Sequence, residues 1–388
     1  MTRKVLFKRL LACCLLVLTL SDCKDAFDPI LKQTDLNSLV VEGYIDGAVP
    51  AEFKISRSRI LSNGDTASRH YEVNARVFIE DDQQNTYPLT EMGSGSYSSV
   101  NTLSLSPSHQ YRLHIFTADN REYLSDFVEF KQSPAIDTIG WKINEGGVQI
   151  SLNTHDVNNA TRFYRWEYNE TWEFHSYYVS RYMYDAATNT VIDRTNNVYK
   201  CWKSNKSTNI LVGSSAKLTD DVISEIPLTY IEPHNFRLSV LYSIWVRQYA
   251  LDINGYNYLL ALRNNTEKVG SIFDPQPNQT KGNIHCITDP SETVIGYAAA
   301  GTSIEKRIFI NNDELPPGWN QWPYCRIRDT LVPNNPDSLK FNFGFSGAFT
   351  PLDAIFMGPG PPVGYSASLV ECVDCTVRGT NIKPSFWP

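Results

Sequence analysis

The feature that most constrains the fold is the segment 163–184, in which aromatic residues recur at even positions. These residues are Trp166, Tyr168, Trp172, Phe174, Tyr178, Tyr182 and Tyr184. The odd positions of the first half are mostly polar: Arg165, Glu167, Asn169, Thr171, Glu173 and His175. Because successive side chains of a β-strand point to opposite faces, the alternation predicts a strand with one aromatic and one polar face. One unbroken strand of this length would reach about 70 Å, so we expect a bend near Asn169 or near His175.

The aromatic face of this segment allows two interpretations. In the simpler one, which we favour, the face covers a hydrophobic core. In the second, its exposed end forms an aromatic platform that binds the sugar rings of a glycan, or a peptide. The candidate platform residues are Trp166, Tyr168, Trp172 and Phe174.

The composition favours a mainly β protein. The chain of 388 residues contains 21 Tyr, 18 Phe and 8 Trp, which are residue types enriched in strands. Its length exceeds that of one ordinary domain. The formal net charge of −7 offers no basic field for a phosphate backbone, so we expect no nucleic-acid partner.

Residues 36–133 are predicted to form a first domain. Short strand-like runs recur in it, separated by turn-forming residues such as those at 63–65 and 93–95. This pattern is typical of an immunoglobulin-like β-sandwich, and the span 75–128 also resembles transthyretin-like modules. The dipeptide Ser133-Pro134 marks the expected boundary.

Residues 135–388 are predicted to form a larger β-rich domain. A second long strand is expected at Asn235–Leu251, and one short helix at Gly255–Lys268, ended by Gly270. After Leu315 the chain is rich in Pro, Gly and Asn. This composition predicts a loop-rich C-terminal segment that is held in place by disulfides.

The N-terminus has the pattern of an export signal. Cationic residues at positions 3, 4, 8 and 9 precede the apolar run Leu10–Leu20, which is too short to span a bilayer. The residues Leu20–Cys23 resemble the lipobox of bacterial lipoproteins, whose cysteine is acylated and becomes the mature N-terminus. We therefore predict a signal peptide at 1–22, a lipidated Cys23 and a tether at 23–35. The sequence leaves open a rival lipobox that ends at Cys13, secretion without a lipid, and a free thiol at Cys23.

The charged residues after Cys23 suggest where the protein is displayed. Lys24, Asp25 and Asp28 resemble the surface-export signal of Bacteroidetes lipoproteins. We therefore expect a protein anchored by lipid in the outer membrane and facing the extracellular side.

Five cysteines follow Cys23. In an exported chain they are expected to form disulfides, and their odd number leaves one thiol over, for which we choose Cys286. The disulfide candidates are Cys201, Cys325, Cys372 and Cys375. If the neighbours Cys372 and Cys375 do not pair with each other, each joins Cys201 or Cys325, and the sequence does not choose between these pairings. The Cys-x-x-Cys motif is also compatible with half a zinc site or a redox pair.

Common catalytic signatures are absent from the sequence. It contains no His-Glu-x-x-His, Gly-x-Ser-x-Gly, Walker or dinucleotide-binding motif, so we expect no catalytic residue, metal or cofactor. Glu170 and Glu173 are close enough in sequence for a glycosidase pair. Because 42 acidic residues produce such pairs by chance, we give this one little weight.

Several stretches together resemble DUF4249, a family of Bacteroidetes outer-membrane lipoproteins that is defined as a domain of unknown function. The stretches are Leu39–Ile45, Asn265–Glu267, Gly270–Pro277, Gly282–His285, Cys372–Thr380 and Lys383–Trp387. The resemblance implies a mostly β lipoprotein, often encoded near a TonB-dependent transporter. It implies no enzymatic activity.

We therefore expect a non-catalytic accessory subunit of a TonB-dependent uptake system that binds a glycan or a peptide. Two further classes of function remain compatible with the sequence: a surface hydrolase acting on polysaccharide or peptide, and a structural or adhesive module.

Overall fold

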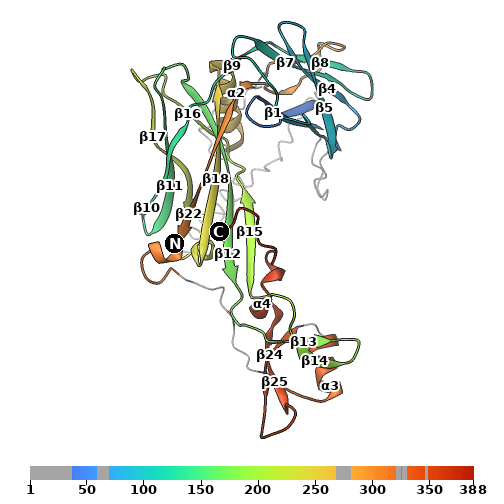
Figure 1. The fold of residues 1–388 in the computed structure, drawn as a ribbon. Helices are drawn as coiled ribbons and strands as arrows, with labels where there is room; N and C mark the ends of the chain where they lie inside the picture. Colours follow the sequence, from blue (N-terminus) through green and yellow to red (C-terminus); the bar gives the residue numbers. More distant parts are fainter. Residues whose placement is uncertain (1–36, 59–69, 268–280, 320–324, 326–329, 346–347) are drawn as a thin grey trace, which may run out of the picture. The chain divides into compact units, whose positions relative to one another are not determined.

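The computed structural model describes residues 37–58, 70–267, 281–319, 325, 330–345 and 348–388. In these residues the protein is mainly β, as predicted (Figure 1). None of the helices in the described ranges is both long and apolar enough to cross a membrane.

The first part of the chain forms one sheet that closes on itself. Its N-terminal strands are β1 (Leu39–Asp46), β2 (Glu52–Arg57), β3 (His70–Tyr71), β4 (Arg76–Asp81), β5 (Thr86–Gly93), β6 (Ser96–Ser98), β7 (Gln110–Phe116), β8 (Glu122–Ser125) and β9 (Val128–Lys131). Three strands come from much later in the chain: β19 (Ile284–Cys286), β20 (Ile295–Gly296) and β21 (Ala300–Gly301). The pairing runs β7-β4-β5-β6-β2-β1-β21-β9, and β9 pairs again with β7. The alternating apolar residues of these strands fill the interior with one buried cluster.

This closed ring corrects the prediction of an immunoglobulin-like or transthyretin-like sandwich, in which two sheets keep separate edges. The ring closes because β21 inserts between β1 and β9, parallel to both. A Cβ atom on Gly301 would lie 1.9 Å from the backbone oxygen of Lys131, so only glycine allows this approach. This segment was expected in the larger domain, because a two-residue strand has no detectable periodicity.

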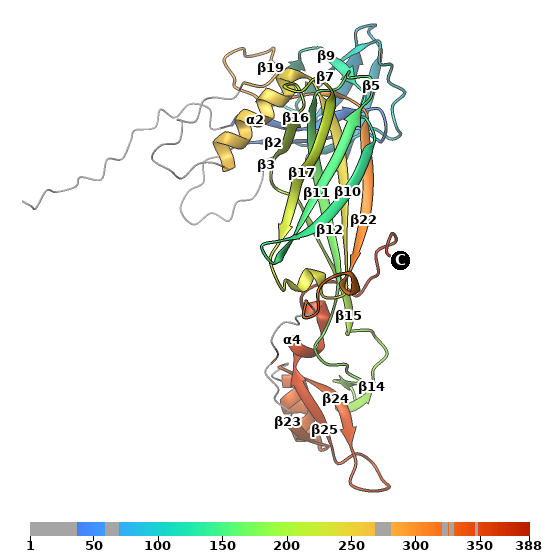
Figure 2. The same ribbon diagram turned by 90° about the vertical axis from the view of Figure 1, so that its left-hand side faces the viewer.

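Two antiparallel sheets make up most of the second part (Figure 2). The central sheet contains β15 (Lys200–Lys206), β12 (Phe163–His175), β18 (Leu241–Leu251) and β22 (Ser303–Asn311) in that order, with β16 (Leu211–Ser214) also pairing with β12. The smaller sheet contains β10 (Ile136–Asn144), β11 (Gly147–Asp156) and β17 (Asp221–Ile231). Apolar side chains from both sheets form a single buried cluster, so the two sheets pack face to face.

The three long elements predicted in this part are present. The strand β12 is continuous and ends at His175, one of the two places where a bend was expected. The helix α2 (Ile253–Glu267) matches the predicted helix closely. The strand β18 begins at Leu241, later than predicted, because a short 3₁₀ turn at Phe236–Leu238 precedes it.

The C-terminal segment is more regular than its composition predicted. It contains a three-stranded sheet of β23 (Thr330–Pro333), β25 (Gly364–Leu369) and β24 (Phe349–Ile355), with the short helices α3 (Pro336–Leu339) and α4 (Val370–Val373). The hairpin β13 (Tyr182–Asp185) and β14 (Thr190–Asp193) contributes Tyr182 and Tyr184 to the same small core. Strands this short gain stability from partners distant in the chain, which composition does not reveal.

Candidate functional site

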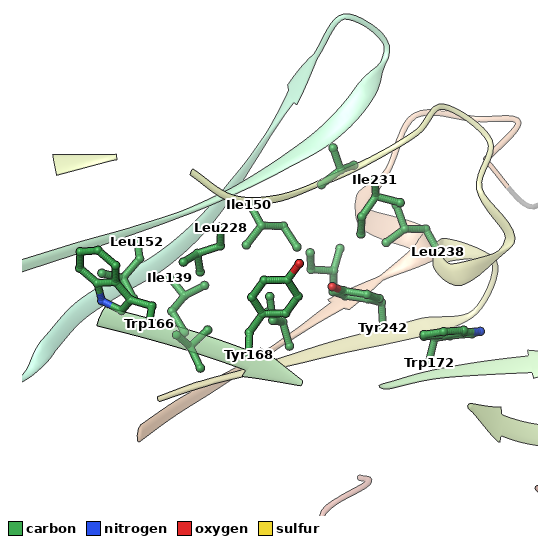
Figure 3. Close-up of a cluster of buried hydrophobic side chains, with 14 of the residues drawn as sticks. Ile139, Ile150, Leu152, Trp166, Tyr168, Trp172, Leu228, Ile231, Leu238 and Tyr242 are labelled. Carbon is green, nitrogen blue, oxygen red and sulfur yellow. The ribbon is translucent and has the colours of Figure 1, made fainter. Parts of the chain in front are cut away.

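The aromatic face of β12 lies in the core and forms no platform. Trp166, Tyr168, Trp172 and Phe174 are all at most 7% exposed. Figure 3 shows Trp166 and Tyr168 lying among isoleucine and leucine side chains of the facing sheet. The platform interpretation is therefore wrong, because the sheet of β10, β11 and β17 covers this side of β12.

Several polar atoms on this buried face have partners inside the core, whereas the indole nitrogen of Trp172 has none among the described residues. The indole of Trp166 donates to the side-chain oxygen of Gln248 at 2.8 Å. The carboxylate of Glu170 accepts from Tyr242 at 2.7 Å and from the guanidinium of Arg237 at 2.8 Å. Such pairing compensates for the loss of water around the buried carboxylate.

Glu170 and Glu173 do not form a glycosidase pair. The alternation of β12 places them on opposite faces of the central sheet. Glu170 contacts Arg237 and Tyr242 on the core side, and Glu173 accepts from Trp387 on the opposite side. The two carboxylates therefore cannot act on the same bond.

The candidate site is the side of the central sheet that faces away from this core, which we call the outer face. The strand registers arrange its side chains in rows that cross the strands. The rows are Glu167, Arg247 and Glu305; Lys206, Asn169, Trp245 and Arg307; and Ser204, Thr171, Ser243 and Phe309. We call the second of these the central row.

The row next to the central row is a network of charges. Arg247 donates to Glu305 at 2.9 Å, and Tyr249 donates to Glu167 at 2.5 Å. The indole of Trp245 donates to Glu305 at 3.1 Å, which fixes the ring at the edge of the network. Burial and the neighbouring Glu167 raise the pKa of the Tyr249 hydroxyl well above its usual value, so it remains a hydrogen-bond donor.

The side chains of the central row include polar groups that have no hydrogen-bond or ion-pair partner among the described residues. Within the described residues, the side-chain amide of Asn169 has no hydrogen-bond partner. Arg307 donates from Nη1 to Ser243 at 3.0 Å, and the ring of Phe386 lies 3.6 Å from its guanidinium carbon. No described carboxylate forms an ion pair with Arg307. Burial lowers the pKa of this guanidinium, against the opposing effect of Glu305.

Segments from elsewhere in the chain cover both ends of the outer face. At one end, Tyr256 of α2 packs on Phe163 with ring centroids 5.1 Å apart. At the opposite end lies the C-terminal tail, residues 379–388, where Thr380 pairs with Trp202 and Trp387 packs 5.6 Å from Phe309. The central row lies between these two covers, and Phe386 of the tail contacts it at Arg307.

The tail is held by a charged hydrogen bond that depends on pH. The indole of Trp387 donates to Glu173 at 3.0 Å, and His175 and Lys200 contact the same carboxylate. Burial acts to raise the pKa of Glu173, but these partners outweigh it and lower the pKa below the usual value. A lowered pKa stabilises the fold above the unfolded value of about 4.3, and this contribution is lost as the pH falls through the folded pKa.

We therefore expect the tail to loosen in acid. Hydrogen exchange of the tail amides, corrected for the intrinsic rate, should lose protection as the pH falls from neutral to below about 4.3. A Glu173→Gln variant should protect the tail less at neutral pH and show little change over this range. Identical pH profiles for the two proteins would contradict this role of Glu173.

Two disulfides link the segment just before the tail to more distant parts of the chain. Cys201 of β15 bonds Cys375, and Cys325 bonds Cys372. Cys372 and Cys375 therefore each have their own distant partner, as expected if they do not pair with each other. The zinc and redox interpretations of Cys372-x-x-Cys375 are wrong, because both sulfurs are already bonded elsewhere. Cys286 is free, as predicted, and it is buried.

The structure does not test the remaining predicted site residue. The lipidation candidate Cys23 lies outside the described residues. In the described part of the chain, no group of three or more His, Cys, Asp or Glu side chains could hold a metal ion.

The residues of the central row were not predicted from the sequence. The odd positions of β12 were identified as polar, but no function was attached to them. The alternation of Trp245 and Arg247 with the apolar residues of β18 gives the same signal. That these residues form one row follows from strand registers, which the sequence does not show.

Comparisons with known proteins identify a family. No curated protein matches the chain. Among solved structures, one described as "Biofilm associated protein - BSP domain" has a TM-score of 0.15 and 8% identity, and the match covers 72% of this chain and 60% of that one. A likeness at this level carries no argument about function. The model of the family described as "Domain of unknown function (DUF4249)" matches residues 24–307. Because this match covers most of the chain, the protein belongs to the DUF4249 family.

Proposed function

We propose that this protein is a non-catalytic lipoprotein of the outer membrane that binds a ligand at the cell surface for a TonB-dependent transporter. The observation that carries the binding role is the central row. Its amide and guanidinium have polar atoms without protein partners among the described residues, on a surface formed by rigid strands. Specific binding sites commonly use a few such groups beside an aromatic ring.

The proposed location is supported by two independent features. The export signal and Cys23 provide a lipid anchor at the end of a short tether. The two disulfides fit an oxidising compartment outside the cytoplasm, where such bonds persist. Outward display is supported by the charged residues after Cys23, and partnership with a transporter by the resemblance to the family.

Replacing Cys23 by serine tests the anchor. The serine oxygen cannot take the place of the acylated sulfur, so the protein should lose the mass of the lipid. Molecules from which the signal peptide is removed by another route should move from the membrane pellet to the soluble fraction. Cell fractionation and mass spectrometry of the mature N-terminus measure both effects. Cys13→Ser is the matched control, because Cys13 ends the rival lipobox, and it should leave the protein in the membrane.

The reverse result would place the lipid at Cys13, and an unchanged Cys23→Ser protein would refute the anchor.

The partnership with a transporter has its own test. A tagged copy expressed from its native locus should bring down a TonB-dependent transporter after mild crosslinking of intact cells. Recovery of the tagged protein without any such transporter would refute that part of the proposal.

A further inference from the structure

The outer face carries a charge opposite to that of the whole protein. Its cations are Arg165, Arg247, Arg307, Lys200 and Lys206, and its carboxylates are Glu167, Glu173 and Glu305. The face is therefore net positive, although the chain as a whole has a net charge of −7. A positive face on an acidic protein favours the approach of an anionic ligand.

Within this face the uncompensated charge is at Arg307. Arg247 is paired with Glu305, Lys200 with Glu173, and the remaining two cations lie within 4 Å of Glu167. Arg307 has no such partner among the described residues. The ring of Phe386 and the bond to Ser243 hold its guanidinium in place. A guanidinium held in this way loses little side-chain freedom when it binds a carboxylate with its remaining N–H groups.

The neighbours of Arg307 suit a sugar. Trp245 is half-buried next to it in the central row, with the guanidinium of Arg247 4.8 Å from its ring centre. Apolar faces of pyranose rings pack on aromatic rings, and their hydroxyl groups bind amides such as that of Asn169. Lys206, with its side chain 67% exposed, provides a second cation at the far end of the row.

The row has the length of a short oligosaccharide. Four neighbouring strands about 4.8 Å apart place the ends of the row, Lys206 and Arg307, about 14 Å from each other. The row crosses the strands, and the backbone groups of β12 and β18 are used in pairing with strands on both sides. A peptide that added a strand to this sheet would lie along the outer edge of β15 or β22, parallel to the strands and not across the row, which disfavours the usual mode of peptide capture by sheets.

We infer that the central row binds an acidic oligosaccharide, with a sugar carboxylate on Arg307, a sugar ring against Trp245 and hydroxyl groups on Asn169. This inference rests on the proposed role in ligand binding and names the class of ligand. It adds a site and a charge requirement that the proposed function does not contain.

Calorimetric titration of the full-length protein in detergent tests the inference. The probes are oligomers of galacturonate, of alginate and of hyaluronate, with methyl-esterified oligogalacturonate as the neutral match and poly-glutamate as the acidic peptide. At least one acidic glycan should bind, more weakly as salt rises, while the methyl ester and poly-glutamate should not. Binding of poly-glutamate at equal strength, binding of the methyl ester at equal strength, or no binding of any acidic glycan would overturn the inference.

Variants of the row provide the second part of the test. Arg307→Gln should weaken binding about tenfold, because it removes a charged hydrogen bond to the ligand. Arg181→Gln is the matched control, since Arg181 is 78% exposed and pairs with Asp353 outside the outer face. Ser204→Lys should strengthen binding, because it adds a cation at an exposed position of the neighbouring row and keeps every contact assigned to the ligand, an effect that misfolding cannot mimic. Unchanged affinity in both Arg307→Gln and Ser204→Lys would overturn the assignment of the site.

The outcome is independent of the membrane experiments. If the transporter is recovered with the tagged protein but no acidic glycan binds, the ligand class is wrong and the accessory role stands. If a glycan binds but no transporter is recovered, the site stands and the partnership fails.

Discussion

Replacing Cys201 and Cys375 together by alanine should lower the free energy of unfolding by about 5 kcal/mol. The disulfide closes a loop between residues 174 positions apart. In the chain-entropy model, the stabilisation grows with the logarithm of this loop, which gives about 5 kcal/mol at 25 °C. Both cysteines are fully buried, and alanine avoids placing a hydroxyl group there. Urea unfolding followed by circular dichroism measures the difference.

The second disulfide is the matched control. Cys325 and Cys372 are 47 positions apart, and the same model gives about 4 kcal/mol for their removal. Reductant should lower the stability of the wild type by breaking both disulfides. In each double variant one of these bonds is already absent, so reductant should lower its stability by a smaller amount. Equal stability of the Cys201 and Cys375 variant and the wild type would contradict the role of this bond in holding the C-terminal segment.

Replacing Trp166 by alanine should cost about 4 kcal/mol of stability. The side chain is 1% exposed between the two packed sheets, and truncating a core tryptophan leaves a cavity that the surrounding strands cannot fill. The change also removes the donor to Gln248, whose side chain is fully buried. A buried acceptor left without its partner adds to the loss. Thermal and urea unfolding of the purified protein measure the effect.

Trp245→Ala is the control for this prediction. Trp245 is also a strand tryptophan of the central sheet, but it lies half-buried on the outer face. Its truncation should cost about 1 kcal/mol or less, as is usual for residues outside the core. If Trp245→Ala unfolded the protein and Trp166→Ala did not, our assignment of the two faces would be inverted.

Much of β12 could be predicted from its sequence alone. The alternation from Phe163 to His175 identified a long strand and separated its residues into two faces. It could not tell whether the aromatic face was covered, because the cover consists of β10, β11 and β17. The prediction of a platform at Trp166, Tyr168, Trp172 and Phe174 was wrong because the sequence of β12 does not show this cover.

Local signals also predicted the helix α2 and the free thiol of Cys286. Hydrophobic spacing and the turn residues at its ends determine where a helix forms, and an odd number of cysteines leaves one unpaired. Local signals did not predict the pairing of the remaining four cysteines. It required knowing that β15 lies beside the C-terminal segment, which is a property of the whole fold.

The amino-acid sequence by itself determined the β class, the two faces of β12 and the places of the long strand β18 and the helix α2. These properties depend on interactions between residues near one another in the chain. Tertiary structure alone decided that β21 closes the first sheet, that Cys201 meets Cys375, and that Asn169, Trp245 and Arg307 form one row. Each of these depends on pairing between strands far apart in the chain, where the register of one backbone against another selects which side chains become neighbours.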